Sequence, residues 1–159
     1  MGREAASSGP GWHETVVRVR YGEVDRMGVV HHRHYLTYFE HGRTEMLRDL
    51  GASYGDVEDS GTLLVVVETG VRFVRPGHYE DDLTIRTRLS EARGVRVRFD
   101  YEIRRKGVLL ATGFTVLASC DVDGRPKRPP EELVALFRGL HGKAEDADDV
   151  QEAATRGTS

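Results

Sequence analysis

The chain has 159 residues and carries 23 Lys and Arg against 26 Asp and Glu, with 38% hydrophobic residues. This length and composition predict one soluble globular domain, and the formal net charge of −3 argues against a basic nucleic-acid binder. The single cysteine, Cys120, excludes an internal disulfide and a cysteine-based zinc site, and no apolar run approaches the roughly 20 residues of a membrane span.

Both ends of the chain differ in composition from its middle. Residues 1–13 are rich in Ser and Gly, and residues 142–159 hold five acids against two bases with almost no large apolar side chain. Such segments cannot bury a core, so we predict a flexible leader and a disordered acidic tail around one domain at residues 14–141. The leader lacks the basic and apolar stretches of a secretory signal, so we expect a cytoplasmic protein.

The first predicted elements are a strand at residues 15–21 and a long helix at residues 34–50. The helix carries one apolar stripe, with spacings of three, four and seven. The stripe consists of Tyr35, Leu36, Phe39, Met46, Leu47 and Leu50. Gly51 follows as a C-terminal stop. At 1.5 Å per residue such a helix is about 25 Å long, enough to cross a sheet of four or five strands.

Four strands are predicted next, at residues 63–74, 83–89, 95–103 and 110–116. The third is the clearest, because from Val95 to Ile103 every odd position is apolar and every even position is charged. That alternation is typical of an antiparallel strand with one buried and one solvent-exposed face. Turns are expected at residues 92–94 and 105–107, and a bulge at Thr69-Gly70.

A short second helix is predicted at residues 130–140, where Pro130 begins it and Glu131 and Glu132 suit its positive N-terminus. The order of strand, long helix, four strands and short helix predicts an α+β fold. In this fold one long helix is wrapped by an antiparallel sheet of five or six strands.

The loop before the long helix, residues 21–36, is the densest in chemical groups. The helix end leaves backbone N–H groups free and carries a partial positive charge, which can hold a developing oxyanion. Asp25 precedes it, where a carboxylate could act as nucleophile or general base. These residues therefore suggest a carbonyl polarised at the helix end and attacked from the Asp25 side. The alternative is that Asp25 caps the loop and the histidines are a solvated helix start.

The histidines of this segment also raise the question of a metal. His31, His32, His34 and His41 lie near Asp25 and Glu40 in the sequence. No adjacent i, i+4 histidine pair with a nearby carboxylate occurs, and zinc sites fix at least three ligands in constrained geometry. We therefore expect no metal.

Several motifs resemble those of a known family. They are Tyr21, residues 25–32 (DRMGVVHH), residues 35–48, residues 75–83 (RPGHYEDDL) and residues 123–130 (DGRPKRPP). Together they resemble the 4-hydroxybenzoyl-CoA thioesterase superfamily, specifically its YbgC-like acyl-CoA thioesterase branch, over about residues 15–138. The resemblance implies the hotdog fold, which agrees with the helix and sheet expected from periodicity.

The resemblance also implies an activity, the hydrolysis of an acyl-CoA to free acid and CoA without a metal or redox cofactor. The family's carboxylate falls on Asp25 and its strand-end tyrosine on Tyr21. Its motif histidine falls on His32, whose backbone N–H would polarise the thioester carbonyl; the alternative is that the His32 ring orients Asp25 or the attacking water. Another branch of hotdog thioesterases places its catalytic Glu on the long helix, which makes Glu40 the second candidate base. Substrate contacts are expected at Val30, His31, Arg93 and Gly94.

Partners follow from charge and from the resemblance. Residues 86–106 hold eight basic side chains against three acidic ones, which suits the phosphates of CoA; the alternative is a solvated outer sheet face. An acyl carrier protein is a second possible carrier of the acyl group. Exposed sheet edges and the resemblance together predict a homodimer or a tetramer of two dimers. The rival functions are a non-catalytic acyl-CoA or acyl-carrier binding protein and a hotdog hydratase or dehydratase.

Overall fold

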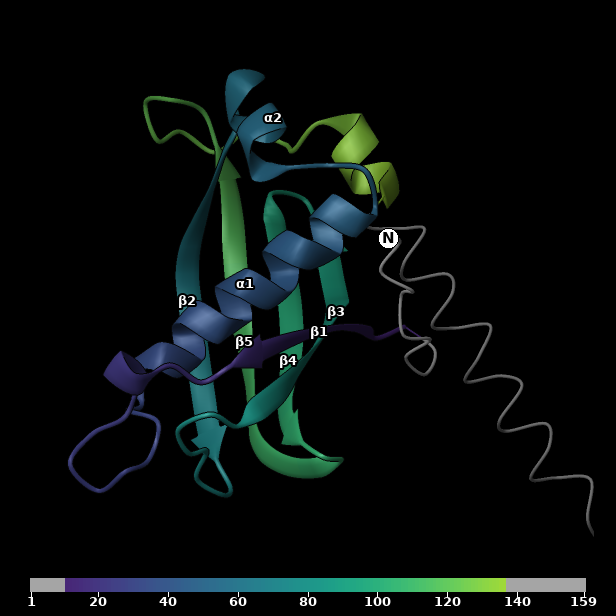
Figure 1. Cartoon of the computed structure of the whole chain (residues 1–159). Coiled ribbons are helices and arrows are strands. Elements are labelled where there is room, and N and C mark those ends of the chain that lie inside the picture. The colour runs from purple at the N-terminus through teal and green to yellow at the C-terminus, as the bar shows by residue number, and fades with distance from the viewer. Residues whose placement is uncertain (1–10, 137–159) are drawn as a thin grey trace, which may run out of the picture.

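A computed structural model describes residues 11–136, which form one antiparallel sheet with a long helix across one face (Figure 1). The strands are β1 (His13–Arg18), β2 (Leu63–Phe73), β3 (Asp82–Arg93), β4 (Arg96–Arg105) and β5 (Val108–Cys120). The helices are the 3-10 turn η1 (Tyr21–Glu23), α1 (Arg33–Asp49) and α2 (Tyr54–Asp59), and residues 131–136 are also helical. The sheet order is β1-β3-β4-β5-β2, so β1 and β2 are the two edges.

The core lies between α1 and the inner face of the sheet. Phe39 of α1 stacks on Tyr101 of β4 with ring centroids 4.3 Å apart and planes 9° apart. A glycine at position 42 lets the helix approach β3, because a Cβ there would lie 2.8 Å from Ile85 Cγ2. Most of the predicted apolar stripe of α1 therefore packs on the strands, but Leu36 is exposed, and Tyr38, outside that stripe, is buried in the core.

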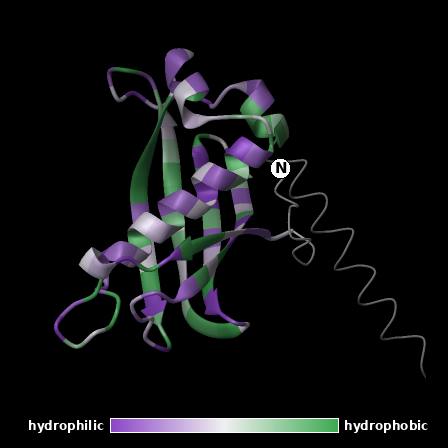
Figure 2. Cartoon of the chain, viewed as in Figure 1, coloured by the Kyte–Doolittle hydropathy of each residue, from purple (hydrophilic) through white to green (hydrophobic). Residues whose placement is uncertain are grey.

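The opposite face of the sheet is polar. Figure 2 shows hydrophilic and hydrophobic residues alternating along the strands. On β4, the inward residues from Val97 to Ile103 are buried, while Asp100 and Glu102 pair with arginines of β3 and β4. The Trp12 ring lies under the guanidinium groups of Arg86 and Arg88, at 4.8 and 4.6 Å. The alternating pattern thus separates core from solvent as expected.

The fold confirms the predicted α+β architecture with a five-stranded sheet, and α1 matches the expected helix to within one residue at each end. The bulge predicted at Thr69-Gly70 is wrong. The register shift lies between Val66 and Glu68, and Gly70 pairs in register with Phe114. The glycine is needed there because a Cβ would lie 2.7 Å from Phe114 Cε1.

Some predictions fall at or beyond the ends of the described chain. The predicted domain start at residue 14 falls inside β1, which begins at His13. Most of the leader, the tail at residues 142–159 and the end of the second helix at residues 137–140 lie outside the described residues. Between residues 11 and 136, no helix is long and apolar enough to cross a membrane.

Candidate active site

The loop between β1 and α1 closes on itself through its backbone. Val24 and Val30 form an antiparallel bridge, and the Asp25 N–H donates to the Val29 carbonyl at 2.9 Å. The Gly28 N–H donates to the Asp25 carbonyl at 3.0 Å, with Gly28 at φ +76°. Such a turn needs a glycine, because left-handed backbone disfavours larger residues. The loop therefore holds Asp25 at a fixed place before the helix.

Asp25 lines a cavity of about 330 Å³ together with His32. Its Oδ1 accepts the Met27 N–H at 2.8 Å, which orients the carboxylate, and no residue within 11–136 donates a hydrogen bond to Oδ2. The other walls are mainly apolar and come both from the same loop and helix start and from the end of β2: Met27, Val30, Tyr35, Phe73, Val74 and Pro76. A carboxylate at the side of an apolar cavity is suited to reaction with an acyl group.

The N-terminus of α1 opens into the same cavity. His32 is the N-cap residue of α1 with helical angles, and its side chain makes no capping hydrogen bond. The neighbouring N–H groups are used, since His31 donates to the Glu23 carbonyl at 2.9 Å and Arg33 to His31 Nδ1 at 3.3 Å. Within residues 11–136, no acceptor takes the N–H of His32. It is thus a free donor at the positive end of the helix.

The histidine rings beside this donor are mutually close. The rings of His31 and His32 lie 4.1 Å apart. Desolvation lowers the pKa of His31, and electrostatic interaction with the neighbouring His32 and Arg33 lowers it further. A neutral His31 agrees with its Nδ1 accepting the Arg33 N–H. His31 therefore acts on the helix start, while His32 faces the cavity.

The structure places the predicted site residues in three locations. Asp25, His32 and Val30 line one cavity, and His31 stacks on His32 beside it. Tyr21 is not brought to this cavity. Its side chain is 79% exposed, packs edge-on against Tyr79 with centroids 5.7 Å apart, and lines a separate groove between β1 and α1.

Arg93 and Gly94 lie at the β3–β4 turn, at the end of the sheet opposite the Asp25 loop (Figure 1). They line a different cavity, with Arg96 and Arg128. Glu40 lies on the exposed side of α1, 3.8 Å from Arg43, and does not line the Asp25 cavity. The chain therefore brings Asp25 and not Glu40 to the free helix end.

Sequence reasoning missed two parts of the site. One is the wall formed by Phe73, Val74 and Pro76, which lie about 40 residues beyond the helix start and reach it only through the sheet. The other is a hydrogen bond from Tyr38 Oη to Glu23 Oε2 at 2.9 Å, which ties α1 to the loop. No local pattern in the sequence signals either contact.

The basic window at residues 86–106 is largely paired. Six of its arginines form ion pairs with carboxylates: Arg86, Arg88, Arg96, Arg98, Arg104 and Arg105. By contrast, Arg26, Arg33 and Arg75 make no ion pair with any described residue; Arg75 lines the Asp25 cavity, and Arg26 and Arg33 directly follow Asp25 and His32 in the chain. The unpaired positive charge near the cavity thus comes from these three arginines. No three His, Cys, Asp or Glu side chains of residues 11–136 gather in a metal-binding arrangement.

Comparisons with known proteins agree with this geometry. Residues 19–137 match the model of a family described as the thioesterase-like superfamily. The chain is 32% identical over 126 residues to the acyl-CoA thioesterase YbgC of Haemophilus influenzae, across 78% of this chain and 93% of that protein.

A second relative is the putative acyl-CoA thioesterase YneP of Bacillus subtilis, 37% identical over 87 residues and 55% of this chain. That alignment spans 63% of YneP, less than two thirds of its length. Among solved structures, a probable thioesterase from Bartonella henselae superposes with a TM-score of 0.71 at 34% identity, covering 75% of this chain and 99% of that one.

Proposed function

The chain belongs to the thioesterase-like superfamily, a family of thioester hydrolases, and we propose that it hydrolyses an acyl-CoA to free acid and CoA in the Asp25 cavity. Membership of this family confirms the prediction from the sequence motifs. The observation that carries the proposal is the meeting of Asp25 with the free N–H of His32 in one mainly apolar cavity. Asp25 attacks the thioester carbonyl carbon or activates a water molecule that does so, and the His32 N–H stabilises the oxyanion that forms.

Substrate binding uses the two kinds of surface at the cavity. The apolar walls, including Phe73 and Val74, take the acyl group, which gains free energy by leaving water. Arg75, which lines the cavity, and Arg33, which follows His32 in the chain, suit the phosphates of CoA, because guanidinium groups bind phosphate in a forked geometry. An acyl carrier protein presents a phosphopantetheine thioester of the same chemistry and is the second candidate carrier.

The chemical step begins with the thioester carbonyl oxygen accepting the His32 N–H. Negative charge develops on that oxygen in the transition state, and the positive end of α1 stabilises it. Asp25 then acts by one of two routes. It takes a proton from a water molecule whose oxygen attacks the carbonyl carbon, or its own oxygen attacks and forms an anhydride that water later hydrolyses. In both routes the C–S bond breaks and the thiolate of CoA leaves.

We further propose that the active form contains two copies of the chain joined through β2. Val65, Val66 and Val67 of this edge strand are each about half exposed, which is unusual for a solvent-facing strand. Phe73 and Val74, at the end of the same strand, line the Asp25 cavity and are also about half exposed. Pairing of two β2 strands would cover these side chains and complete the cavity wall.

The experiment that tests the proposed function is thiol release from a panel of acyl-CoAs of different chain length and aromaticity, with acyl-carrier thioesters in parallel. We expect turnover of at least one acyl-CoA. Tight binding of acyl-CoA without thiol release would instead support the non-catalytic binding protein. Hydration of an enoyl-CoA without thiol release would support the hydratase.

A further inference from the structure

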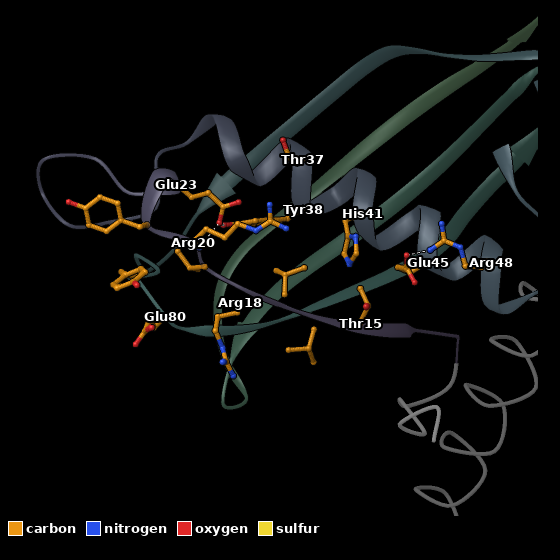
Figure 3. A pocket seen from close by; sticks show the side chains of 15 residues that line it. Thr15, Arg18, Arg20, Glu23, Thr37, Tyr38, His41, Glu45, Arg48 and Glu80 are labelled. Atoms are coloured by element: carbon orange, nitrogen blue, oxygen red, sulfur yellow. Dashed lines mark hydrogen bonds and ion pairs between the residues drawn. The ribbon is translucent and has the colours of Figure 1, made fainter. Parts of the chain in front are cut away.

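Glu23 lies on the side of the loop opposite the Asp25 cavity. It lines a groove of about 780 Å³ between β1 and α1, into which Figure 3 shows Glu23, Tyr38 and Arg20 converging. Glu23 Oε2 accepts two hydrogen bonds, from Tyr38 Oη at 2.9 Å and from the Arg20 N–H at 2.8 Å. Its side chain therefore joins the end of β1 to the second turn of α1.

The backbone of Glu23 reaches the helix end itself. Its carbonyl accepts the N–H of His31 at 2.9 Å, directly before the free N–H of His32. Asp25 follows Glu23 by two residues, and its own N–H is bonded to Val29. A displacement of Glu23 would therefore move the oxyanion donor and the carboxylate relative to each other.

Tyr38 is a rigid anchor for this contact. Its side chain is buried and packs edge-on against Tyr35, which lines the Asp25 cavity, with centroids 6.1 Å apart. Burial and the neighbouring Glu23 raise the pKa of Tyr38, so the phenol remains a donor throughout any practical assay range. Neither Tyr38 nor Glu23 lines the Asp25 cavity, so neither is placed to touch the reacting atoms.

We propose that Glu23 and Tyr38 are positioning residues for thioester hydrolysis. Their hydrogen bond fixes the His31–His32 peptide relative to Asp25, so that the His32 N–H and the Asp25 carboxylate act on the same carbonyl. This inference rests on the proposed function and adds two residues to it. Catalysis by a fixed donor and base depends steeply on geometry, because a misplacement of about 1 Å can cost about 10²-fold in rate.

The two hydrogen bonds that Glu23 accepts predict losses of kcat that differ in size among three variants. Tyr38→Phe keeps the packed ring and leaves the Arg20 N–H on the carboxylate, so kcat should fall about 10-fold. Glu23→Ala removes both side-chain bonds, so kcat should fall about 10²-fold. Both bonds converge on one oxygen, so Glu23→Gln supplies a single amide oxygen for both and should restore kcat to within about 3-fold of wild type. KM should stay within about 2-fold throughout, because the apolar walls are unchanged.

A double variant tests whether the two residues act through one contact. Tyr38→Phe combined with Glu23→Ala should lose no more kcat than Glu23→Ala alone. Tyr79→Phe and Glu80→Gln are the matched controls, since both side chains line the same groove and are exposed, and among the described residues neither side chain hydrogen-bonds the loop; Tyr79→Phe also keeps the ring that packs against Tyr21. Both controls should keep the wild-type kcat, and urea unfolding should confirm that each assayed variant is folded.

The outcomes separate this inference from the proposed function. Wild-type protein that releases no thiol from any thioester overturns the proposed function. Active wild type with unchanged kcat in Tyr38→Phe and Glu23→Ala overturns the positioning role alone, as do losses that multiply in the double variant. If Glu23→Ala fails to fold, the kcat of Tyr38→Phe is the test. An unchanged kcat in Tyr38→Phe then overturns the positioning role.

Discussion

The Asp25→Asn variant removes the carboxylate of the cavity while keeping the hydrogen bonds that hold the loop. Asparagine keeps an oxygen that can accept the Met27 N–H, now 2.8 Å from Asp25 Oδ1, and the bonds to Val29 and Gly28 use only the backbone. The free energy of unfolding should therefore stay within about 0.5 kcal/mol of wild type. The variant loses the carboxylate that attacks the thioester or activates a water molecule to attack it, so kcat should fall by at least about 10²-fold. That loss corresponds to a barrier raised by about 3 kcal/mol or more.

The assay is thiol release at saturating acyl-CoA, with KM measured alongside. KM should change less than about 3-fold, because the apolar walls and the His32 N–H remain. Asp121→Asn is a matched control, since Asp121 Oδ1 also accepts loop N–H groups, from Asp123 and Arg125, outside the Asp25 cavity. That control should keep the wild-type kcat. A near wild-type kcat in Asp25→Asn would refute the reasoning and transfer the role to Glu40.

Three further predictions concern assembly, substrate binding and acid stability. Val66→Asp should break pairing through β2 and abolish activity together with the dimer, as light scattering would show; a fully active monomer would contradict this. Arg33→Gln with Arg75→Gln should raise KM for acyl-CoA about 10-fold and flatten its salt dependence, without affecting an acyl-N-acetylcysteamine thioester; equal salt slopes for both substrates would remove the arginines from phosphate binding. Desolvation alone would raise the pKa of Asp81, but hydrogen bonds from the His78 N–H and the Arg105 guanidinium hold that pKa below the ordinary range of an aspartate. The stabilisation from this carboxylate is therefore present above the ordinary range and lost as pH falls through it toward the lowered pKa. Urea unfolding of wild type and Asp81→Asn should therefore converge in acid, and a constant difference would exclude this linkage.

The parts of the fold that were predicted are those with strong local patterns. The stripe of α1 and the alternation of β4 each run over at least nine residues, so their periods are unambiguous. The short helix α2 was missed because six residues span less than two turns; its only local signal is Ser53, whose side chain accepts the Asp56 N–H. Gly70 was misread as a bulge because its role depends on Phe114, which lies in another strand.

For the candidate site too, the sequence predicts only the features that arise from residues close together in the chain. Asp25 and His32 could be proposed together, and they do line one cavity, because the loop and the helix start are contiguous in sequence and carry a specific motif. The position of Tyr21 depends on which way its side chain leaves the η1 turn, and it faces Tyr79 instead of the cavity. A count of charges could not show that Arg86 and Arg88 of β3 pair with Glu102 and Asp100 of β4, because that pairing depends on strand register.

The most direct test of the central claim is a crystal structure of Asp25→Asn bound to an intact acyl-CoA. The account predicts the thioester carbonyl oxygen about 2.7–3.2 Å from the backbone nitrogen of His32. It also predicts the carbonyl carbon facing the side chain at position 25 and the acyl group against Phe73 and Val74. A thioester bound beside Glu40, or in the groove lined by Tyr21 and Tyr79, would contradict it.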